Sequence, residues 1–533
     1  MTVKVTKLNQ VAGSGKTTGL IKLIKENKDK KILFLTFSKF AIQDFEIRLR
    51  KDKVIPKDIT FSTIHAMAVR NLKKYENFEI PKGGDPAVPS VARTMRMKYK
   101  DLYKFSSMYI NGLRQQIKDD LKISEERQDV IWEGLVNIYE EYKEYPHNYI
   151  MYKFNQIFKE VANEFQYDVL MIDEAQDLSI LQIEVIKKII KENEDLEVHV
   201  VGDILQNIYR FRFSGPELLT EQITEGEDIK IKATTYRCSN TVIDRANRLI
   251  DVYYDTEKEQ EKFKVKIEAY RDEEGKYTYC DKKTSSFHIS EMIKNAIAEK
   301  STLGILVRAN YQIRDLIPFI TEDIAKNVFI KESNIFDSLA VTAFDSLLNI
   351  KGLINIKRLT LDKVKKFLLV MRIYSYQKQL EFFNLIKNGT NVSTKNYTWK
   401  KYLKALNSCS PHTFDEFKEN YFELIRESEI YKDNTGDTEA FISFLNNIES
   451  EAGYKQKVQI ANRLHDKLNN NQNIIITTIH SSKGTEYDNI ILYGMDYKIQ
   501  DYIDEVKLLY VGVTRARNNI LQVGKNELSS ILT

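Results

Sequence analysis

The sequence predicts an α/β fold with parallel sheets, and two observations lead to this prediction. Short apolar runs, typical of strands buried on both faces, alternate with segments whose apolar residues recur at helical spacing. The first strand pattern runs into a glycine-rich loop at residues 10–18, and a helical pattern follows at once. Strand, loop and helix in this order are typical of a parallel sheet, whose ligands bind at the carboxyl ends of its strands.

Length and composition limit the class of protein. The chain has 533 residues, enough for several domains with sizeable cores. Hydrophobic residues make up 42% and charged residues 29%, a composition of soluble globular proteins rather than disordered chains. The 80 basic and 76 acidic side chains leave a net charge of only +4. Any nucleic-acid contact is therefore expected in a local groove and not in a basic tail.

Cysteines and apolar runs exclude further classes. Cys238, Cys280 and Cys409 have no paired spacing, so neither a disulfide framework nor a zinc or iron–sulfur site is indicated. No apolar run approaches the roughly 18 residues of a membrane span, and the first expected strand begins directly after the N-terminal residues, without a signal peptide. We expect a cytoplasmic protein with no membrane partner.

The loop at residues 10–18, QVAGSGKTT, has the pattern of a phosphate-binding loop. Its glycines let several backbone N–H groups point at one anion, and the N-terminus of the following helix adds partial positive charge. Lys16 would reach the β- and γ-phosphates, and the Thr17 hydroxyl would bind Mg²⁺. The usual first glycine is replaced by Gln10, and a plain Gly-Ser turn is the alternative for this stretch alone. The expected nucleotide-binding residues of the loop are Gln10, Gly13, Ser14, Gly15, Lys16, Thr17 and Thr18.

Two further strands, at residues 31–36 and 59–61, bring polar and aromatic residues to the same edge of the sheet. Thr36 and Phe37 fall at the carboxyl end of the first strand, and Thr63 and His65 fall at that of the second. Because ligands bind at this edge in parallel sheets, these four residues are candidates for ligand contact. The alternative places Phe37 in the core and makes His65 a helix cap.

An acidic motif follows the next strand of the sheet. Residues 81–89 are rich in proline and glycine, which interrupt regular secondary structure. A charged helical pattern follows to about residue 163, and the strand pattern resumes at 167–172. Asp173 and Glu174 come directly after it. Asp173 can hold Mg²⁺, and Glu174 can orient and deprotonate an attacking water. A solvated acidic cluster is the alternative, which the buried strand before it disfavours.

Further motifs give the chain a family resemblance. A strand at 198–201 leads into GDILQNIYRFR at 202–212. With the other motifs, this stretch resembles the UvrD-like helicases of superfamily 1, the group of UvrD, Rep and PcrA, and compact members such as phage-encoded and Gabija-type defence helicases look similar. The matching motifs, in order, are the phosphate loop, residues 36–39, 63–65, 173–177, 202–212, 235–239 with 246–247, 304–310, 478–487 and 509–517.

The resemblance implies two RecA-like P-loop domains that sandwich one ATP with Mg²⁺. It makes Gln206 the sensor of the γ-phosphate and Tyr236 the aromatic that stacks on adenine. Arg237 and Arg515 match paired arginine fingers, which stabilise the charge of the transferred phosphoryl group. Glu486 matches a ribose contact. With Lys16, Asp173 and Glu174, the residues Gln206, Arg237 and Arg515 form the expected catalytic set.

The resemblance also implies a single-stranded DNA site. Phe37, Tyr209 and Phe211 match aromatic residues that stack on bases, although the family usually has Trp at the position of Phe211. The DNA-binding set that we expect is Thr36, Phe37, Thr63, His65, Tyr209, Phe211, Arg212, Arg308 and His480. Single-stranded DNA and its junctions with duplex DNA are the expected partners.

The resemblance and the helical patterns divide the chain into four parts, each RecA-like domain carrying a mostly helical insertion. We expect residues 1–80 and 164–232 to form the first RecA-like domain, with a helical insertion at 81–163. Residues 233–350 and 456–533 would form the second, with an insertion at 351–455. Residues 253–301 are expected to be irregular, and an Asn/Thr/Ser loop is expected at 388–396. The family's Leu-Asn-x-x-Gln helix before the phosphate loop has no counterpart, so selectivity for ATP over GTP is expected to be relaxed.

Three functions are consistent with these motifs. The first is an ATP-driven 3′→5′ translocase and helicase on single-stranded DNA. The second is a regulatory ATPase subunit that binds DNA ends with little unwinding of its own, in a complex with a nuclease or another defence or recombination subunit. The third is a P-loop ATPase without a nucleic-acid substrate, which the aromatic motifs disfavour. DNA-stimulated ATPase activity would exclude the third, and unwinding assays would separate the first two.

Overall fold

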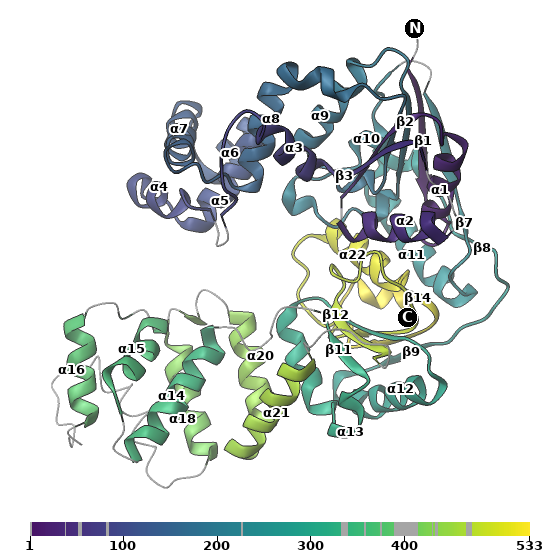
Figure 1. Ribbon diagram of the computed structural model, residues 1–533. Helices are drawn as coiled ribbons and strands as arrows, with labels where there is room; N and C mark the ends of the chain where they lie inside the picture. Colours follow the sequence, from purple (N-terminus) through teal and green to yellow (C-terminus); the bar gives the residue numbers. More distant parts are fainter. Residues whose placement is uncertain are drawn as a thin grey trace. The chain divides into compact units, whose positions relative to one another are not determined.

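The computed structural model describes residues 3–37, 39–51, 56–81, 85–224, 227–331, 339–355, 359–371, 373, 376–387, 414–428, 430–431, 435–464 and 472–533. The chain forms two compact units, whose elements are labelled in Figure 1. The first unit contains Met1–Gly275 and Ile499–Thr514, and the second contains Lys276–Lys498 and Arg515–Ile531. Each unit has one six-stranded parallel sheet, which confirms the predicted α/β class with parallel sheets.

The sheet of the first unit has the strand order β3-β2-β4-β5-β1-β6, and all neighbouring strands are parallel. Every residue of β4 is buried, as the uninterrupted apolar run predicts. The strands are β1 (Lys4–Gln10), β2 (Lys31–Thr36), β3 (Asp58–Thr63), β4 (Val169–Ile172), β5 (Glu197–Gly202) and β6 (Asp228–Lys232). The helices that follow strands of this sheet are α1 (Lys16–Glu26), α2 (Lys39–Lys51), α3 (Ile64–Leu72), α9 (Ile180–Lys191) and α10 (Glu217–Thr220).

The described residues between α3 and β4 contribute no strand to this sheet and are mainly helical. The helices are α4 (Val88–Met95), α5 (Tyr99–Ile110), α6 (Arg114–Leu121), α7 (Glu125–Tyr142) and α8 (His147–Val161). Helix α8 packs against α3 and α9 and so joins this helical segment to the sheet domain (Figure 1). The core of the helical segment α4–α8 is rich in aromatic rings, among them Trp132 and Tyr149.

The first unit continues beyond β6. A small parallel sheet pairs β7 (Thr234–Thr235) with β8 (Glu268–Ala269), and α11 (Asn240–Thr256) lies between them in the chain. Helix α22 (Tyr502–Val513) packs on α11, so a segment near the C-terminus belongs to the first unit. The two units are groups of segments that pack together, whichever part of the chain they come from. The four parts expected from the sequence are instead defined by where a helical insertion interrupts each RecA-like domain. The four-part division stays a prediction.

The sheet of the second unit has the order β11-β12-β10-β13-β14-β9, again all parallel. One continuous apolar core joins this sheet to the helices between β11 and β12. The strands are β9 (Tyr277–Cys280), β10 (Leu303–Val307), β11 (Val328–Ile330), β12 (Ile474–Thr478), β13 (Tyr487–Tyr493) and β14 (Ala516–Val523). The helices are α12 (Ser285–Glu299), α13 (Glu322–Ala325), α14 (Leu339–Asn355), α15 (Leu361–Val370), α16 (Tyr376–Lys387), α18 (Phe414–Arg426), α20 (Thr435–Asn446) and α21 (Glu451–Leu464).

One prediction about local structure was wrong. Residues 253–301 are not irregular throughout, because they include the end of α11, strand β9 and helix α12. In α12, Ile289, Ile293 and Ala296 recur at helical spacing and are buried in the core of the second unit, although charged residues surround them in the sequence. The expected loop at 388–396 lies outside the described residues, and so do Gly83 and Gly84 of the proline- and glycine-rich stretch 81–89. None of the described helices is both long and apolar enough to cross a membrane.

Candidate nucleotide and DNA sites

The phosphate loop follows β1 and depends on two glycines in the left-handed region. Gly13 has φ 73° and Gly15 has φ 84°. A Cβ atom on Gly13 would lie 2.5 Å from Thr235 Oγ1 and 2.7 Å from Arg237 Cβ, so a larger residue does not fit. Gly15 is the N-cap of α1 and makes no side-chain capping bond. The N-terminus of α1 is therefore available to an anion, as a phosphate-binding loop requires.

Lys16 lies inside the loop. Its Nζ donates to the backbone carbonyl of Gln10 at 3.1 Å and lies 4.0 Å from Asp203 Oδ2. The Ser14 hydroxyl donates to Gln10 Oε1 at 3.4 Å, which directs the Gln10 side chain into the loop. Thr17 lies in the first turn of α1, and Thr18 beside it is exposed. The ammonium of Lys16 is thus held by protein oxygens that a nucleotide phosphate could replace.

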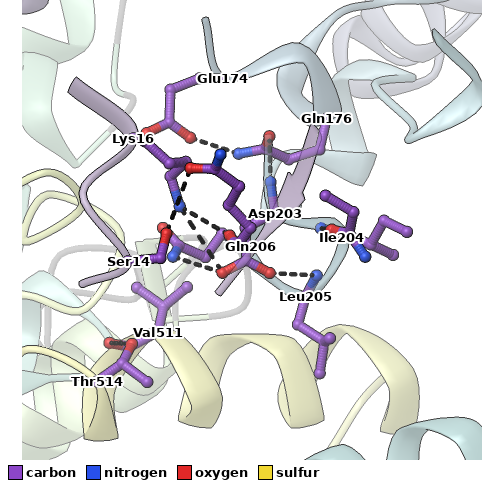
Figure 2. Close-up of polar contacts among 12 residues, drawn as sticks. Ser14, Lys16, Glu174, Gln176, Asp203, Ile204, Leu205, Gln206, Val511 and Thr514 are labelled. Carbon is purple, nitrogen blue, oxygen red and sulfur yellow. Dashed lines mark hydrogen bonds and ion pairs between the residues drawn. The ribbon is translucent and has the colours of Figure 1, made fainter. Parts of the chain in front are cut away.

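Asp203, directly after β5, is the centre of a buried network (Figure 2). Its carboxylate accepts hydrogen bonds from Gln206 Nε2 at 2.8 Å, from the Leu205 N–H at 3.2 Å and from the Tyr510 hydroxyl at 3.2 Å. Burial raises the pKa of Asp203, while the Lys16 ammonium and the Gln206 hydrogen bond oppose this shift. The network holds Gln206, the expected γ-phosphate sensor, in one orientation.

The acidic motif after β4 is joined to this network through Gln176. Gln176 Nε2 donates to Glu174 Oε2 at 2.5 Å, and Gln176 Oε1 accepts the Asp203 N–H at 3.0 Å (Figure 2). Glu174 itself has φ 52°, a left-handed conformation that is costly for a residue with a side chain. Such strain concentrates at functional sites.

Thr17 and Asp173, the residues expected to hold Mg²⁺, offer the oxygen donors that this ion prefers. Asp173 directly follows β4 and is buried, and Asp203, which directly follows the adjacent strand β5, is buried as well. A divalent cation would offset the negative charge of these two carboxylates. The residues therefore fit the ion chemically, and their role as ligands stays a prediction.

The segment after β6 brings two more expected residues to the loop. The Tyr236 N–H donates to the Gly13 carbonyl at 2.9 Å, and Tyr236 is about half exposed. Arg237 Nη1 donates to the carbonyl of Thr514, at the end of α22, at 3.3 Å. The structure thus brings the expected adenine-stacking residue and one expected arginine finger to the phosphate loop.

Four other expected residues belong to the second unit and are described within it. Arg515 is only 2% exposed, and its Nη1 donates to the Thr485 carbonyl at 3.1 Å. Glu486 forms an ion pair with Arg517. The Arg308 guanidinium lies 5.8 Å from the centre of the Tyr497 ring. His480 follows β12 in a turn. Their expected roles toward nucleotide and DNA stay predictions.

A groove of about 590 Å³ opens beside the ends of β2 and β3, between the sheet domain and the helical segment α4–α8. Five expected DNA-binding residues line it, namely Thr36, Phe37, Thr63, His65 and Arg212. The groove is also lined by Asn111, directly after α5, by His147, the first residue of α8, and by other residues that the sequence reasoning did not single out. No motif marks them, since their place in the groove results from packing of the inserted helices.

His65 is not the cap of its helix. Thr63 caps α3, because its hydroxyl accepts the Ala66 N–H at 3.1 Å. The His65 ring meets the His147 ring edge-on, with 4.5 Å between centroids. Burial and the facing His147 lower the pKa of His65 to about 4. His65 is therefore neutral at physiological pH and could contact DNA only as a neutral hydrogen-bonding group.

The expected stacking residues lie at the same edge of the sheet. The rings of Phe37 and Tyr209 are stacked, with 5.3 Å between centroids and 21° between planes. The Arg212 guanidinium lies 5.6 Å from the Tyr209 ring. The side chain of Phe211 lies outside the described residues, so its stacking role stays a prediction.

Comparison with known proteins decides the family. The model of the UvrD/REP helicase N-terminal domain matches residues 10–226, and the model of the UvrD-like helicase C-terminal domain matches residues 347–523. The chain belongs to the UvrD-like helicases of superfamily 1. These are ATP-hydrolysing enzymes.

Several curated relatives extend over most of this UvrD-like chain. The ATP-dependent DNA helicase Rep of Buchnera aphidicola (from Acyrthosiphon pisum) is 24% identical, over 96% of this chain and 90% of its own length. The ATP-dependent DNA helicase PcrA of Bacillus subtilis is 22% identical, over 96% of this chain and 79% of its own. The F-box DNA helicase protein 1 of Schizosaccharomyces pombe is 22% identical, over 97% of this chain and 55% of its own.

In this UvrD-like helicase, α22 contacts both the nucleotide network and the segment that carries the aromatic residues. Near its start, Asp504 accepts a hydrogen bond from Arg210 Nη1 at 3.2 Å, next to Tyr209. Two turns later, the Tyr510 hydroxyl donates a hydrogen bond to the Asp203 carboxylate.

The sequence reasoning missed Asp203, Gln176 and Tyr510 as site residues. All three stand within motifs it recognised, but nothing local signals that Tyr510 bonds to a residue 307 positions away.

Proposed function

We propose that this chain is an ATP-driven motor that moves 3′→5′ along single-stranded DNA and unwinds duplex DNA ahead of it. One observation carries the proposal. A single parallel sheet has the phosphate loop and the acidic strand end on one half of its carboxyl edge and the groove on the other. Helix α22 is bonded to the nucleotide network through Tyr510, and through Asp504 to Arg210, which lies next to Tyr209 in the segment that carries the aromatic residues. A motor needs such a connection, because hydrolysis has to change the grip on DNA.

The proposed hydrolysis uses residues already held in place. The loop N–H groups and Lys16 bind the phosphates of ATP, with Lys16 exchanging the Gln10 carbonyl for a phosphate oxygen. Glu174 orients a water and takes its proton as the water oxygen attacks the γ-phosphorus and the bond to the β-phosphate breaks. Mg²⁺ bound by Thr17 and Asp173 would neutralise charge on the phosphates. Gln206 senses the γ-phosphate, and Arg237 stabilises the charge of the transition state.

The proposed DNA contact relies on stacking more than on charge. The Phe37–Tyr209 pair offers ring faces to bases, which is independent of sequence because every base has an aromatic face. Arg212 lines the groove and would meet a phosphate. A motor that steps along any sequence needs a contact of this kind.

The test is strand polarity together with DNA-stimulated ATPase activity. ATPase should rise when single-stranded DNA is added, and a duplex with a 3′ tail should be unwound in preference to one with a 5′ tail or blunt ends. Preference for the 5′ tail would contradict the proposed direction. DNA-stimulated ATPase without unwinding would favour instead the DNA-end-binding regulatory subunit, and repeating the assay with a nuclease or recombination partner would then decide.

A further inference from the structure

A second lysine lies beside the phosphate loop and is not part of any motif. Lys232 ends β6, in register with Gln10 at the end of β1. Its carbonyl accepts the Val11 N–H at 3.2 Å, which fixes its backbone against the start of the loop. Its Nζ lies 4.0 Å from the position that a Cβ on Gly15 would take. The same Nζ lies 5.0 Å from the centre of the Tyr236 ring. An ammonium thus sits between the glycine of the loop and the expected base-stacking ring.

A second tyrosine lies against Tyr236. Tyr270 directly follows β8, and its N–H donates to the Thr235 carbonyl at 3.0 Å, so the small β7–β8 sheet brings the two tyrosines together. Their ring centroids are 4.7 Å apart, with 49° between the planes. Tyr236 is 47% exposed and Tyr270 is 70% exposed. Two contacting rings with this much surface in water offer an apolar platform to a flat ligand.

The amides nearest the loop are engaged with protein. Asn9 Oδ1 accepts the Ile204 N–H at 3.4 Å, and Gln10 Oε1 accepts the Ser14 hydroxyl at 3.4 Å. Both residues are buried. One hydrogen bond thus holds each amide oxygen against a protein donor, and we expect a base at the tyrosine platform to be held mainly through its face. Stacking of this kind distinguishes adenine from guanine poorly.

We propose that Lys232 and Tyr270 extend the nucleotide site on the base side of the phosphate loop. Lys232 adds a second positive charge for the phosphates, and Tyr270 positions the Tyr236 ring and enlarges the platform for a purine of either kind. This proposal rests on the proposed function, because it requires that the loop binds a nucleoside triphosphate. ATP and GTP should consequently bind with similar affinity.

The test compares ATP, GTP and inorganic tripolyphosphate as competitors of a ribose-labelled fluorescent ATP, with the full chain and without DNA. Tripolyphosphate has the phosphates but no base. Tyr270→Ala should weaken ATP and GTP alike, by about 3- to 10-fold, and leave tripolyphosphate unchanged. Tyr270→Phe should bind like the wild type. Lys232→Met should weaken all three competitors by similar factors, since a charge at the phosphates acts on each of them.

Tyr99, an exposed tyrosine of α5, supplies the matched control, and Tyr99→Ala should leave all affinities unchanged. The proposal is overturned if Tyr270→Ala has no effect or weakens tripolyphosphate as much as ATP, if Lys232→Met spares tripolyphosphate, or if the wild type binds ATP far more tightly than GTP. Because the assay contains no DNA, its outcome is separate from that of the proposed function. A chain that binds as expected but lacks DNA-stimulated hydrolysis refutes the motor alone.

Discussion

The two halves of the carboxyl edge of the first sheet differ in how far their polar groups are linked to one another. On the half formed by β4, β5, β1 and β6, a chain of hydrogen bonds runs from Glu174 through Gln176 to Asp203, although the buried Asn207 Oδ1 after β5 has no hydrogen-bond partner among the described residues. On the half formed by β2 and β3, the buried Thr36 hydroxyl and the buried His65 Nε2 have no hydrogen-bond partner among the described residues.

This difference indicates two strategies on one sheet. The nucleotide half is organised before its ligand arrives, so its residues cost no rearrangement when charge develops in the transition state. The groove half offers ring faces and polar atoms to which a ligand can bind. Substitutions in the first half should therefore act on the rate of reaction, and substitutions in the second should act on affinity for DNA.

The largest effect is expected in the nucleotide half. Glu174→Gln removes the proposed base but keeps the size of the side chain and its approach to Gln176, so turnover should fall about 10²- to 10⁴-fold while ATP still binds. Lys16→Ala should also abolish DNA-stimulated ATPase, but through lost nucleotide binding. Steady-state ATPase and equilibrium nucleotide binding separate the two. Normal turnover of Glu174→Gln would exclude its role as the base.

Most of the strands that carry this half are easy to recognise in the sequence. Strand β4 was expected within residues 167–172 and is observed at Val169–Ile172, where the apolar run is buried throughout. The edge strand β6 was not predicted, because its DIKIK sequence alternates charge with exposed isoleucines and lacks the apolar run of a buried strand. Lys232, at its end, was missed for the same reason.

The groove could be predicted only in part. Thr36, Phe37, Thr63 and His65 lie at the ends of β2 and β3 and were named from the sequence. The contribution of His147 depends on how α8 packs on α3, which is a tertiary contact with no local signal.

The next effect in size concerns the groove. Phe37→Ala deletes one ring of the stacked pair with Tyr209, so affinity for single-stranded DNA should fall by about 1–3 kcal/mol at any salt concentration. ATPase without DNA should hardly change. Fluorescence anisotropy with a labelled oligonucleotide at two salt concentrations measures this. Phe37→Tyr, which keeps a ring, is the control and should bind nearly normally. Equal binding by Phe37→Ala would show that the ring only packs against Tyr209.

A smaller effect should appear with pH. Because the pKa of His65 is lowered to about 4 in the fold, the folded state binds fewer protons at this residue than the unfolded state between about pH 6.5 and 4. Its contribution to stability is present above pH 6.5 and is lost as the pH falls through this window, at no more than about 1.4 kcal/mol per pH unit. Urea unfolding of the wild type and of His65→Gln at pH 7 and pH 5 checks this. The variant should lose less stability than the wild type, and equal losses would exclude His65 as the cause.

The smallest effect would test the link between the two halves. Arg210 and Asp504 join the aromatic segment to α22, but their side chains are 44% and 38% exposed, so the pair itself contributes less than about 1 kcal/mol. Arg210→Ala, Asp504→Asn and the double variant should each lower DNA stimulation of the ATPase by about 2- to 5-fold and leave DNA-free ATPase unchanged. The double variant should be no worse than either single one, because one contact is lost in all three. High salt should bring the wild type toward the variants, since it screens an exposed pair. Additive losses would mean that the two residues act separately and that α22 does not connect hydrolysis to the groove through this contact.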